Sequence, residues 1–262
     1  YRSTSESYGF DPQPETRVES TYHPFRVERV SVLQSRPYGF VALPDGRLIA
    51  TEKTRGVSII EEDGQQGPLG TGTPPVWDTL LSLRGAWLNL GIMLDIALHP
   101  DYESNGWIYL SHTDRCWLDC GSLLPVTMVR VLRGRLRGNS WVDEEVVWSV
   151  HRDHYTPVPD AVAAGRLAFD QEHHLYISIG GKNTYDKLHN LDTPFGKIHR
   201  VFDDGRVPRD NPFFVEEGKR DPTSTRHTVW SIGHRTGQGL STHHTTGGAW
   251  KRAQGPHGGG GS

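Results

Sequence analysis

Arg235 and Gln238 are the residues whose types and spacing most clearly indicate chemistry. They lie in the stretch W-S-I-G-H-R-T-G-Q-G-L at residues 230–240, and A-Q-G-P follows at residues 253–256. This stretch places a planar cationic donor and an amide after a strand-like run, between glycines that allow a ligand to approach the backbone closely. Packing alone requires none of these groups, so the stretch predicts a site for a polar ligand.

Further short phrases occur along the chain in a consistent order. They are P-Y-G-F at residues 37–40, L-P-D-G-R-L at 43–48, L-D-I-A-L-H-P-D-Y at 94–102, G-R-L-A-F at 165–169 and P-F-G-K-I at 194–198. Together with G-H-R-x-x-Q-G-L and Q-G-P, these phrases resemble the soluble pyrroloquinoline-quinone (PQQ) dependent sugar dehydrogenases, also called the glucose/sorbosone dehydrogenase family. The resemblance extends from about Phe25 to Pro256. It implies a β-propeller fold and an oxidoreductase that acts on CH-OH groups.

The resemblance also implies which residues hold the cofactor. PQQ is a planar anion with carboxylates and adjacent quinone carbonyls, so its site needs cationic partners, amide donors and a bridging calcium ion. The resemblance implies that Arg235 faces the quinone oxygens and that Gln238 lies close by. Gly255 and Pro256 would offer backbone carbonyls to the calcium. Thr236 stands where the family usually has Asn, so one amide contact differs here.

Lys182 is a further candidate cofactor contact, because a lysine at this loop position would place a positive charge near the quinone. A plainer alternative remains for each of the two cations. Arg235 could form a structural ion pair on a loop, and Lys182 could be a solvated loop lysine. The surrounding motif favours the binding role for Arg235.

Sugar oxidation also needs a general base, which takes the hydroxyl proton while hydride passes to the quinone carbon. In the family this base is a His shortly before the G-R-L phrase, and the aligned position here is Val162. A slip of one or two residues brings Asp160 to that position, so Asp160 is the candidate catalytic residue. An Asp after Pro159 is alternatively a turn residue. His154 is a second candidate, which loop flexibility would have to bring in.

Two other expected site positions also differ from the family. A family Asp that follows the next strand falls on Gly181, and a substrate-contacting Gln falls on Leu90. These differences keep a second hypothesis open, in which the scaffold binds carbohydrate or protein without catalysis.

Composition excludes some functional classes. The chain has 262 residues, 35% of them hydrophobic and 23% charged, with a net charge of -3. This nearly neutral charge does not favour nucleic acid or an anionic membrane as a partner. The sequence contains no apolar run of about 18 residues, so it predicts no membrane-spanning helix. The resemblance implies a periplasmic or secreted protein. Cys116 and Cys120 are the two cysteines, and their spacing allows either a small disulfide loop or two free thiols.

A strand-turn-strand phrase recurs along the sequence and predicts the architecture. It occurs at residues 38–51, 96–111, 167–178 and, more weakly, 240–253. Recurrence at intervals of roughly 50 to 75 residues is expected for β-propeller blades with long connections. Alternation from Phe25 predicts a half-buried strand over residues 25–30, whereas residues 155–164 and 180–193 are expected to form loops. A generic β-sandwich is the alternative fold.

The expected fold class is therefore all-β, a β-propeller of the six-bladed sugar dehydrogenase type shortened to about four blades. We expect an extended N-terminal arm over residues 1–24, the partial propeller over 25–256 and a Gly/Ser tail over 257–262. A tail of this composition is typical of an expression linker or a truncation scar. Open sheet edges would favour self-association or a partner that completes the ring.

The first functional hypothesis is a PQQ-dependent dehydrogenase that oxidises an aldose hydroxyl and passes electrons to an external acceptor, with calcium as a second cofactor. The sugar substrate and the electron acceptor are the partners that this hypothesis implies. The alternatives are the non-catalytic binding propeller and an inactive fragment of such an enzyme.

Overall fold

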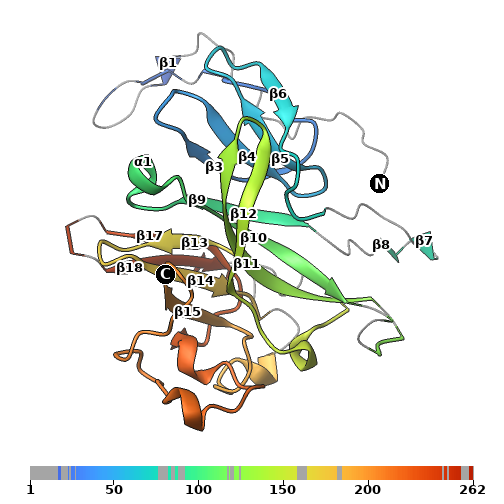
Figure 1. The fold of residues 1–262 in the computed structure, drawn as a ribbon, viewed down its shortest axis with the longest axis vertical. Coiled ribbons are helices and arrows are strands. Elements are labelled where there is room, and N and C mark those ends of the chain that lie inside the picture. Colours follow the sequence, from blue (N-terminus) through green and yellow to red (C-terminus); the bar gives the residue numbers. More distant parts are fainter. Residues whose placement is uncertain are drawn as a thin grey trace.

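The computed structural model describes residues 17–18, 23, 25–26, 28–75, 82–83, 86–87, 92–116, 118, 121–123, 125–157, 164–181, 185–243, 245–246, 248–254 and 260–261. Within these residues the chain forms three four-stranded sheets, one three-stranded sheet and two two-stranded sheets. All strand pairs are antiparallel. In Figure 1 the first large sheet lies at the top, the second below it and the third further down, while the fourth lies beside the third.

The first sheet contains β3 (Pro37–Ala42), β4 (Leu48–Glu52), β5 (Gly56–Ile60) and β6 (Gln66–Leu69), in that order across the sheet. The predicted turn L-P-D-G-R-L joins β3 to β4, and Gly46 in this turn has a φ of 87°. A positive φ is readily adopted by glycine, which explains the D-G step in the turn.

The second sheet contains β9 (Met93–Leu98), β10 (Ile108–Cys116), β11 (Val126–Arg137) and β12 (Ser140–Trp148). The short helix α1 (Tyr102–Asn105) lies in the connection between β9 and β10. Cys116, at the end of β10, is disulfide-bonded, and the one other cysteine of the sequence, Cys120, lies outside the described residues.

The third sheet contains β13 (Leu167–Phe169), β14 (His174–Ile179), β15 (Lys197–Phe202) and β16 (Val229–Ile232). The fourth contains β17 (Gly237–Thr242), β18 (Ala249–Gln254) and β19 (Gly260–Gly261). The remaining elements are short: β1 (Arg17–Val18) pairs with β2 (Phe25–Arg26), β7 (Ser82–Leu83) pairs with β8 (Ala86–Trp87), and single 3-10 turns occupy η2 (Arg152–His154), η3 (Tyr185–Lys187), η4 (Glu217–Lys219) and η5 (Arg226–Thr228).

The first strands of the four large sheets, β3, β9, β13 and β17, are called the inner strands here. β3 packs beside β9, β9 beside β13, and β13 beside β17. Successive antiparallel sheets joined through their first strands are the arrangement of β-propeller blades. The predicted all-β propeller with about four blades is confirmed, and each of the predicted strand-turn-strand phrases forms a hairpin.

Two apolar clusters fill the space between the sheets. One lies between the first and second sheets and includes Ile49, Val57 and Leu110. The other joins the second and third sheets through residues such as Leu94 and Ile177. A middle sheet is covered on both faces, so the side chains on both sides of its strands are buried. This explains the continuous apolar runs in the sequence. Burying one such Leu or Ile contributes about 1.5–3 kcal/mol.

The predicted strand over residues 25–30 was wrong beyond its first two residues. Strand β2 ends at Arg26, and residues 28–33 form no strand. Val30 and Val32 are 59% and 68% exposed. The alternation of apolar and charged residues is present, but within the described part of the chain no strand pairs with residues 28–33.

No helix in the described part of the chain is both long and apolar enough to cross a membrane.

Candidate functional site

Polar side chains from all four inner strands, or from the residues next to them, meet at one end of these strands. Tyr38 is the second residue of β3, Asp95 the third of β9, and Gln238 the second of β17, while Arg166 directly precedes β13. These four residues are called the central cluster. Since each lies near the beginning of its strand, the cluster occupies the end of the propeller where the chain enters the inner strands.

A buried ion pair forms the base of the central cluster. Arg166 Nη1 lies 3.1 Å from Asp95 Oδ1 and donates a second hydrogen bond, of 2.9 Å, to the backbone oxygen of Tyr38. The other carboxylate oxygen of Asp95 accepts a hydrogen bond of 3.0 Å from the backbone N–H of Leu167. Burial raises the pKa of Asp95, and the charge of Arg166 opposes this rise. The pair therefore ties β3, β9 and β13 together at one point.

Tyr38 links this ion pair to the fourth sheet. Its ring lies under the guanidinium of Arg166, 4.0 Å from the guanidinium carbon to the ring centroid. Its hydroxyl donates to the backbone oxygen of Ala164 and lies 3.4 Å from Gln238 Oε1. The hydroxyl has one proton, which the shorter contact assigns to Ala164, so the 3.4 Å contact brings the Gln238 amide to the edge of the central cluster without fixing which of its ends faces a ligand. Gln238 itself is exposed.

Glycines in the motifs make this close approach possible. A Cβ atom on Gly39 would lie 2.2 Å from Asp95 Oδ1, so the glycine of P-Y-G-F is required for the carboxylate to reach its place. Gly165, in G-R-L-A-F, has a φ of 62°, and its backbone oxygen accepts a hydrogen bond of 2.5 Å from Ser111 Oγ. The glycines in these motifs therefore allow side chains from neighbouring strands to pack directly against the backbone, where a Cβ atom would collide with them.

The loop between β16 and β17 carries the residues that the sequence predicts to bind the cofactor. Thr236 is buried, and its hydroxyl donates to the backbone oxygen of Arg235 at 2.7 Å. The same backbone oxygen accepts a hydrogen bond from the N–H of Gly181. Arg235 is half-buried. The loop therefore carries Arg235 and Thr236 and is held to Gly181 by this hydrogen bond. It leads directly into β17, where Gln238 joins the central cluster.

His234, next to Arg235, is held on both sides of its ring. Its Nδ1 lies 2.5 Å from Lys251 Nζ, and its Nε2 lies 2.5 Å from Ser231 Oγ. Burial, followed by the charges of Lys251 and Lys197, lowers the pKa of His234 to about 4, so the ring is neutral at pH 7. An ammonium only donates, so Nδ1 accepts from Lys251 and the ring proton lies on Nε2, which donates to Ser231. Sequence reasoning did not identify this chain of three residues.

Two lysines close to this loop lack a carboxylate partner within the described residues. Lys197 is fully buried, and its Nζ donates to the backbone oxygens of Phe195 and Lys187 at 2.8 and 3.2 Å. Burial lowers its pKa to about 8, and Asp192 opposes the shift. Burial also lowers the pKa of Lys251. Cations that are desolvated without a counterion favour the binding of an anion nearby.

The structure explains one departure from the family. A Cβ atom on Gly181 would lie 2.1 Å from Leu188 Cδ2 and 3.1 Å from the Cα of Gly196. A side chain at this position would require the Leu188 side chain to move and would crowd the backbone of Gly196, so the present packing disfavours the family's Asp there.

The other predicted site residues lie outside the described residues. These are the candidate base Asp160, the candidate cofactor contact Lys182, the candidate calcium ligands Gly255 and Pro256, and the altered positions Val162 and Leu90. Their roles remain predictions.

His154, the second candidate base, has a structural contact. Its Nε2 lies 2.7 Å from the backbone oxygen of Thr223, and its ring packs edge-on against Phe195. Because a backbone carbonyl only accepts, Nε2 carries the proton and is not available as a base. His174 also has a structural contact, since its Nδ1 lies 2.9 Å from Asp170 Oδ2 and its side chain is buried.

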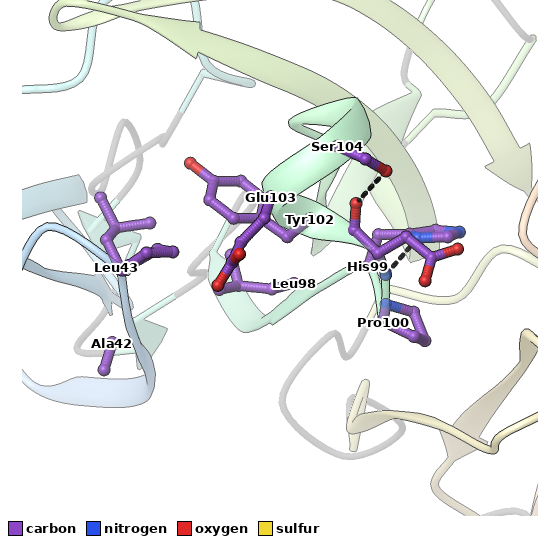
Figure 2. A pocket seen from close by; sticks show the side chains of 10 residues that line it. Ala42, Leu43, Leu98, His99, Pro100, Tyr102, Glu103 and Ser104 are labelled. Carbon is purple, nitrogen blue, oxygen red and sulfur yellow. Dashed lines mark hydrogen bonds between the residues drawn. The ribbon is translucent and has the colours of Figure 1, made fainter.

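A groove of about 520 Å³ lies at the opposite end of the first two inner strands. It is lined by residues 42–44 and 98–104, which follow the last residues of β3 and β9. Figure 2 shows Ala42 and Leu43 on one wall, facing Leu98 and Tyr102 across the opening. His99 at its edge accepts a hydrogen bond of 2.9 Å from the backbone N–H of Asp101. None of the predicted site residues lines this groove.

No group of three or more His, Cys, Asp or Glu side chains suited to a metal ion occurs within the residues that the structure describes.

Comparisons with known proteins agree with these motifs. Residues 34–260 match the family described as Glucose / Sorbosone dehydrogenase. Aldose sugar dehydrogenase YliI of Escherichia coli is 30% identical over 239 residues, which cover 88% of this chain and 57% of that protein. Quinoprotein glucose dehydrogenase B of Acinetobacter calcoaceticus is 26% identical over 233 residues, which cover 79% of this chain and 44% of that protein.

Similarity extends to three dimensions. The crystal structure of the soluble aldose sugar dehydrogenase from Escherichia coli in the apo form matches with a TM-score of 0.70 at 26% identity, over 86% of this chain and 59% of that chain. The chain spans about half the length of the curated relatives it matches. The resemblance inferred from the sequence motifs is confirmed: the chain belongs to the glucose/sorbosone dehydrogenase family.

Proposed function

We propose that the chain is the site-bearing part of a PQQ-dependent oxidoreductase, which oxidises an aldose hydroxyl and passes the electrons to an external acceptor. The observation that carries this proposal is the position of Gln238, whose amide reaches the central cluster directly after the loop with Arg235 and Thr236. The family and the named activities of the relatives support a sugar dehydrogenase type of chemistry.

The residues present fit an anionic, planar cofactor. Lys197 and Lys251 are desolvated without a carboxylate partner among the described residues, and Gln238 presents an amide. PQQ, when bound, supplies a quinone that accepts a hydride from the sugar. In the proposal Arg235 faces the quinone oxygens, Thr236 and Gln238 hold the ring by hydrogen bonds, and Lys182 adds a positive charge.

Calcium and the catalytic base belong to the proposal as well. The backbone oxygens of Gly255 and Pro256 would coordinate calcium, which prefers oxygen ligands. Asp160 would accept the proton of the sugar hydroxyl, in place of the family's His at the position of Val162.

A titration of calcium-loaded protein with PQQ tests the proposal, followed by absorbance and calorimetry. We expect saturable binding in the micromolar range or tighter, weakened at least about tenfold by Arg235→Ala, since a hydrogen bond to a charged group contributes roughly 1.5–3 kcal/mol. Arg252→Ala is the matched control, because Arg252 is exposed on β18. Absence of saturable binding in excess calcium would refute the proposal for this chain.

Turnover is tested separately. With PQQ bound, we expect aldose-dependent reduction of an artificial electron acceptor, and Asp160→Asn should lower its rate while leaving the affinity for PQQ unchanged. Equal rates for the two proteins would exclude Asp160 as the base.

A second candidate function is a non-catalytic propeller that binds carbohydrate or protein. Gly181 favours it, because this glycine stands where the family has an Asp and the side chain of Leu188 occupies the space beside it. It predicts calorimetric sugar binding without turnover at any pH. An inactive fragment of an active enzyme is distinguished from both, since a longer chain would then regain activity.

Location and partners complete the proposal. A disulfide-bonded Cys116 supports an oxidising compartment, the periplasm or the cell exterior. Phe40 on β3 and Trp250 on β18 are 72% and 67% exposed, which supports self-association through the outermost sheets. Sedimentation velocity over a range of concentrations would detect such association.

Boundaries at residues 24 and 256 are proposed as the limits of the propeller, and limited proteolysis tests them.

A further inference from the structure

Arg166 has one edge that makes hydrogen bonds and one edge that makes none to the residues that the structure describes. Both of its side-chain hydrogen bonds leave from Nη1, one to the backbone oxygen of Tyr38 and one to Asp95. The guanidinium also rests on the ring of Tyr38. These three interactions fix the plane of the guanidinium and its rotation within that plane.

The opposite edge consists of Nε and Nη2. Nε is buried and has no hydrogen-bond partner, and Nη2 makes no hydrogen bond to any residue that the structure describes. The side chain as a whole is 22% exposed. The parallel N–H groups of this edge match the two oxygens of a carboxylate, which can accept both hydrogen bonds at once. A buried donor without a partner in a rigid setting points to a ligand that supplies the acceptor.

The local charge also favours an anion. Asp95 is the acid that contacts Arg166, and both of its oxygens are already engaged, one by Arg166 and one by the backbone of Leu167. A second cation approaches the cluster, because Lys53 Nζ lies 5.0 Å from the centroid of the Tyr38 ring. The positive charges of Arg166 and Lys53 both attract an anion that approaches the exposed amide of Gln238.

We propose that the Nε–Nη2 edge of Arg166 is a carboxylate-binding subsite of the central cluster, with Lys53 adding long-range attraction. In part this rests on the proposed function, because a carboxylate of PQQ is one source of the group. An acidic sugar, such as a uronate, is the other source, and it binds the same donors through the same chemistry.

Calorimetry with three probes separates the two sources. The probes are PQQ with calcium, D-glucuronate, and D-glucose as the neutral counterpart of glucuronate. Arg166→Gln removes the charge and the paired donors, while Arg166→Lys keeps the charge and removes the paired donors. We expect each change to weaken the carboxylate-bearing probe at least about tenfold and to leave glucose unaffected. Arg135→Gln is the matched control, because Arg135 also stacks on an aromatic ring, 3.7 Å from Trp107, but lies outside the cluster.

A second readout uses the unmodified protein and does not depend on variants that fold. The Nε–Hε resonance of Arg166 in a ¹⁵N-edited NMR spectrum is assigned in the wild type through its nuclear Overhauser contacts with the ring of Tyr38, on which the guanidinium rests. We expect this resonance to shift when the carboxylate-bearing probe is added and to stay in place with glucose.

The outcomes distinguish this subsite from the proposed function. Loss of PQQ affinity in the Arg166 variants assigns the edge to the cofactor, and loss of glucuronate affinity assigns it to the substrate. If glucuronate shifts the Arg166 resonance and PQQ does not bind, the subsite stands and the cofactor proposal fails. If PQQ binds equally well to the wild type and to both Arg166 variants, and neither PQQ nor glucuronate shifts the resonance, the subsite is overturned and the cofactor proposal stands. If neither acidic probe binds or shifts the resonance, both are overturned.

Discussion

Arg166 and Tyr38 contact each other twice, although 128 positions separate them in the sequence: Nη1 of Arg166 donates to the backbone oxygen of Tyr38 at 2.9 Å, and the guanidinium carbon lies 4.0 Å from the centroid of the Tyr38 ring. The Tyr38 hydroxyl then reaches Ala164 and Gln238. One tyrosine thus connects the ion pair beneath the site with the amide that we propose to contact the cofactor.

Tyr38→Phe isolates the role of this hydroxyl, because the ring remains for Arg166 to stack on. We expect a loss of about 1 kcal/mol in the free energy of unfolding and a roughly tenfold loss of PQQ affinity, as the Gln238 amide is no longer oriented. Denaturant unfolding and calorimetry measure the two effects. Tyr102→Phe, at the opposite groove, is the control.

A double-mutant cycle separates orientation from simple packing. If Tyr38 acts through Gln238, then Tyr38→Phe costs little further affinity in a Gln238→Ala background. Full additivity of the two losses would mean that the residues act independently.

Restoring the family's acid at Gly181 is expected to damage the fold rather than to restore activity. A side chain there meets Leu188 and the backbone of Gly196, and overpacking of this kind costs about 1–3 kcal/mol, with a buried carboxylate adding to the loss. We therefore expect Gly181→Asp to lower the urea midpoint clearly. Gly218→Asp is the control, since no atom lies within 4 Å of its Cβ position. Equal midpoints for the two variants would contradict the packing argument.

Stability is expected to fall between pH 6.5 and pH 5 because of buried histidines. Burial lowers the pKa of His112 to about 4 and that of His199 to about 3. In this range the unfolded chain binds protons that the folded chain does not, so acidification favours unfolding. Each of the two contributes about 2 kcal/mol at pH 5, since one pH unit corresponds to 1.36 kcal/mol.

Urea unfolding at pH 7 and pH 5 measures this loss. His112→Leu should reduce the difference in the free energy of unfolding between the two pH values, because leucine does not titrate. The substitution breaks no hydrogen bond of Nε2, which has no partner. His151→Gln, at an exposed position, should leave the difference unchanged. A pH difference that is the same in all three proteins would refute the assignment.

Alkaline conditions are expected to act in the opposite direction through Lys197. Its pKa is lowered to about 8 in the folded chain, so between pH 8 and pH 10 the unfolded chain holds a proton that the folded chain has lost. Stability therefore rises with pH in this range, by up to about 3 kcal/mol from this residue. Affinity for an anionic ligand should fall over the same range as the positive charge disappears. Lys197→Met should remove the rise in stability, which pH-dependent urea unfolding would show.

The strand phrases could be predicted because each hairpin is encoded locally. In residues 38–51 the apolar runs and the P-D-G turn lie within one stretch, and the structure has β3 and β4 there. The strand predicted over residues 25–30 does not extend beyond Arg26, because its formation depends on a partner from another part of the chain. Alternation shows that a segment could pair, but the presence of a partner strand is decided elsewhere in the chain.

The site was predictable only where the motif itself carries the chemistry. Arg235 and Gln238 were identified from one short stretch, whereas the pairing of Arg166 with Asp95 joins residues 71 positions apart, which no local pattern reports. The phrases P-Y-G-F and G-R-L carried the missing signal, since their glycines mark points where the backbone is approached closely.

The hydrogen bonds of Tyr38 also determine when the molecule can be completed during synthesis. Its partners Ala164, Arg166 and Gln238 lie 126, 128 and 200 positions later in the chain. The first sheet can form as soon as its strands leave the ribosome, and β9 of the second sheet then covers β3. The polar groups of Tyr38 still lack these partners until the third and fourth sheets have been translated. Contacts of such long range close slowly, so this interval is the period in which a chaperone would act on this protein.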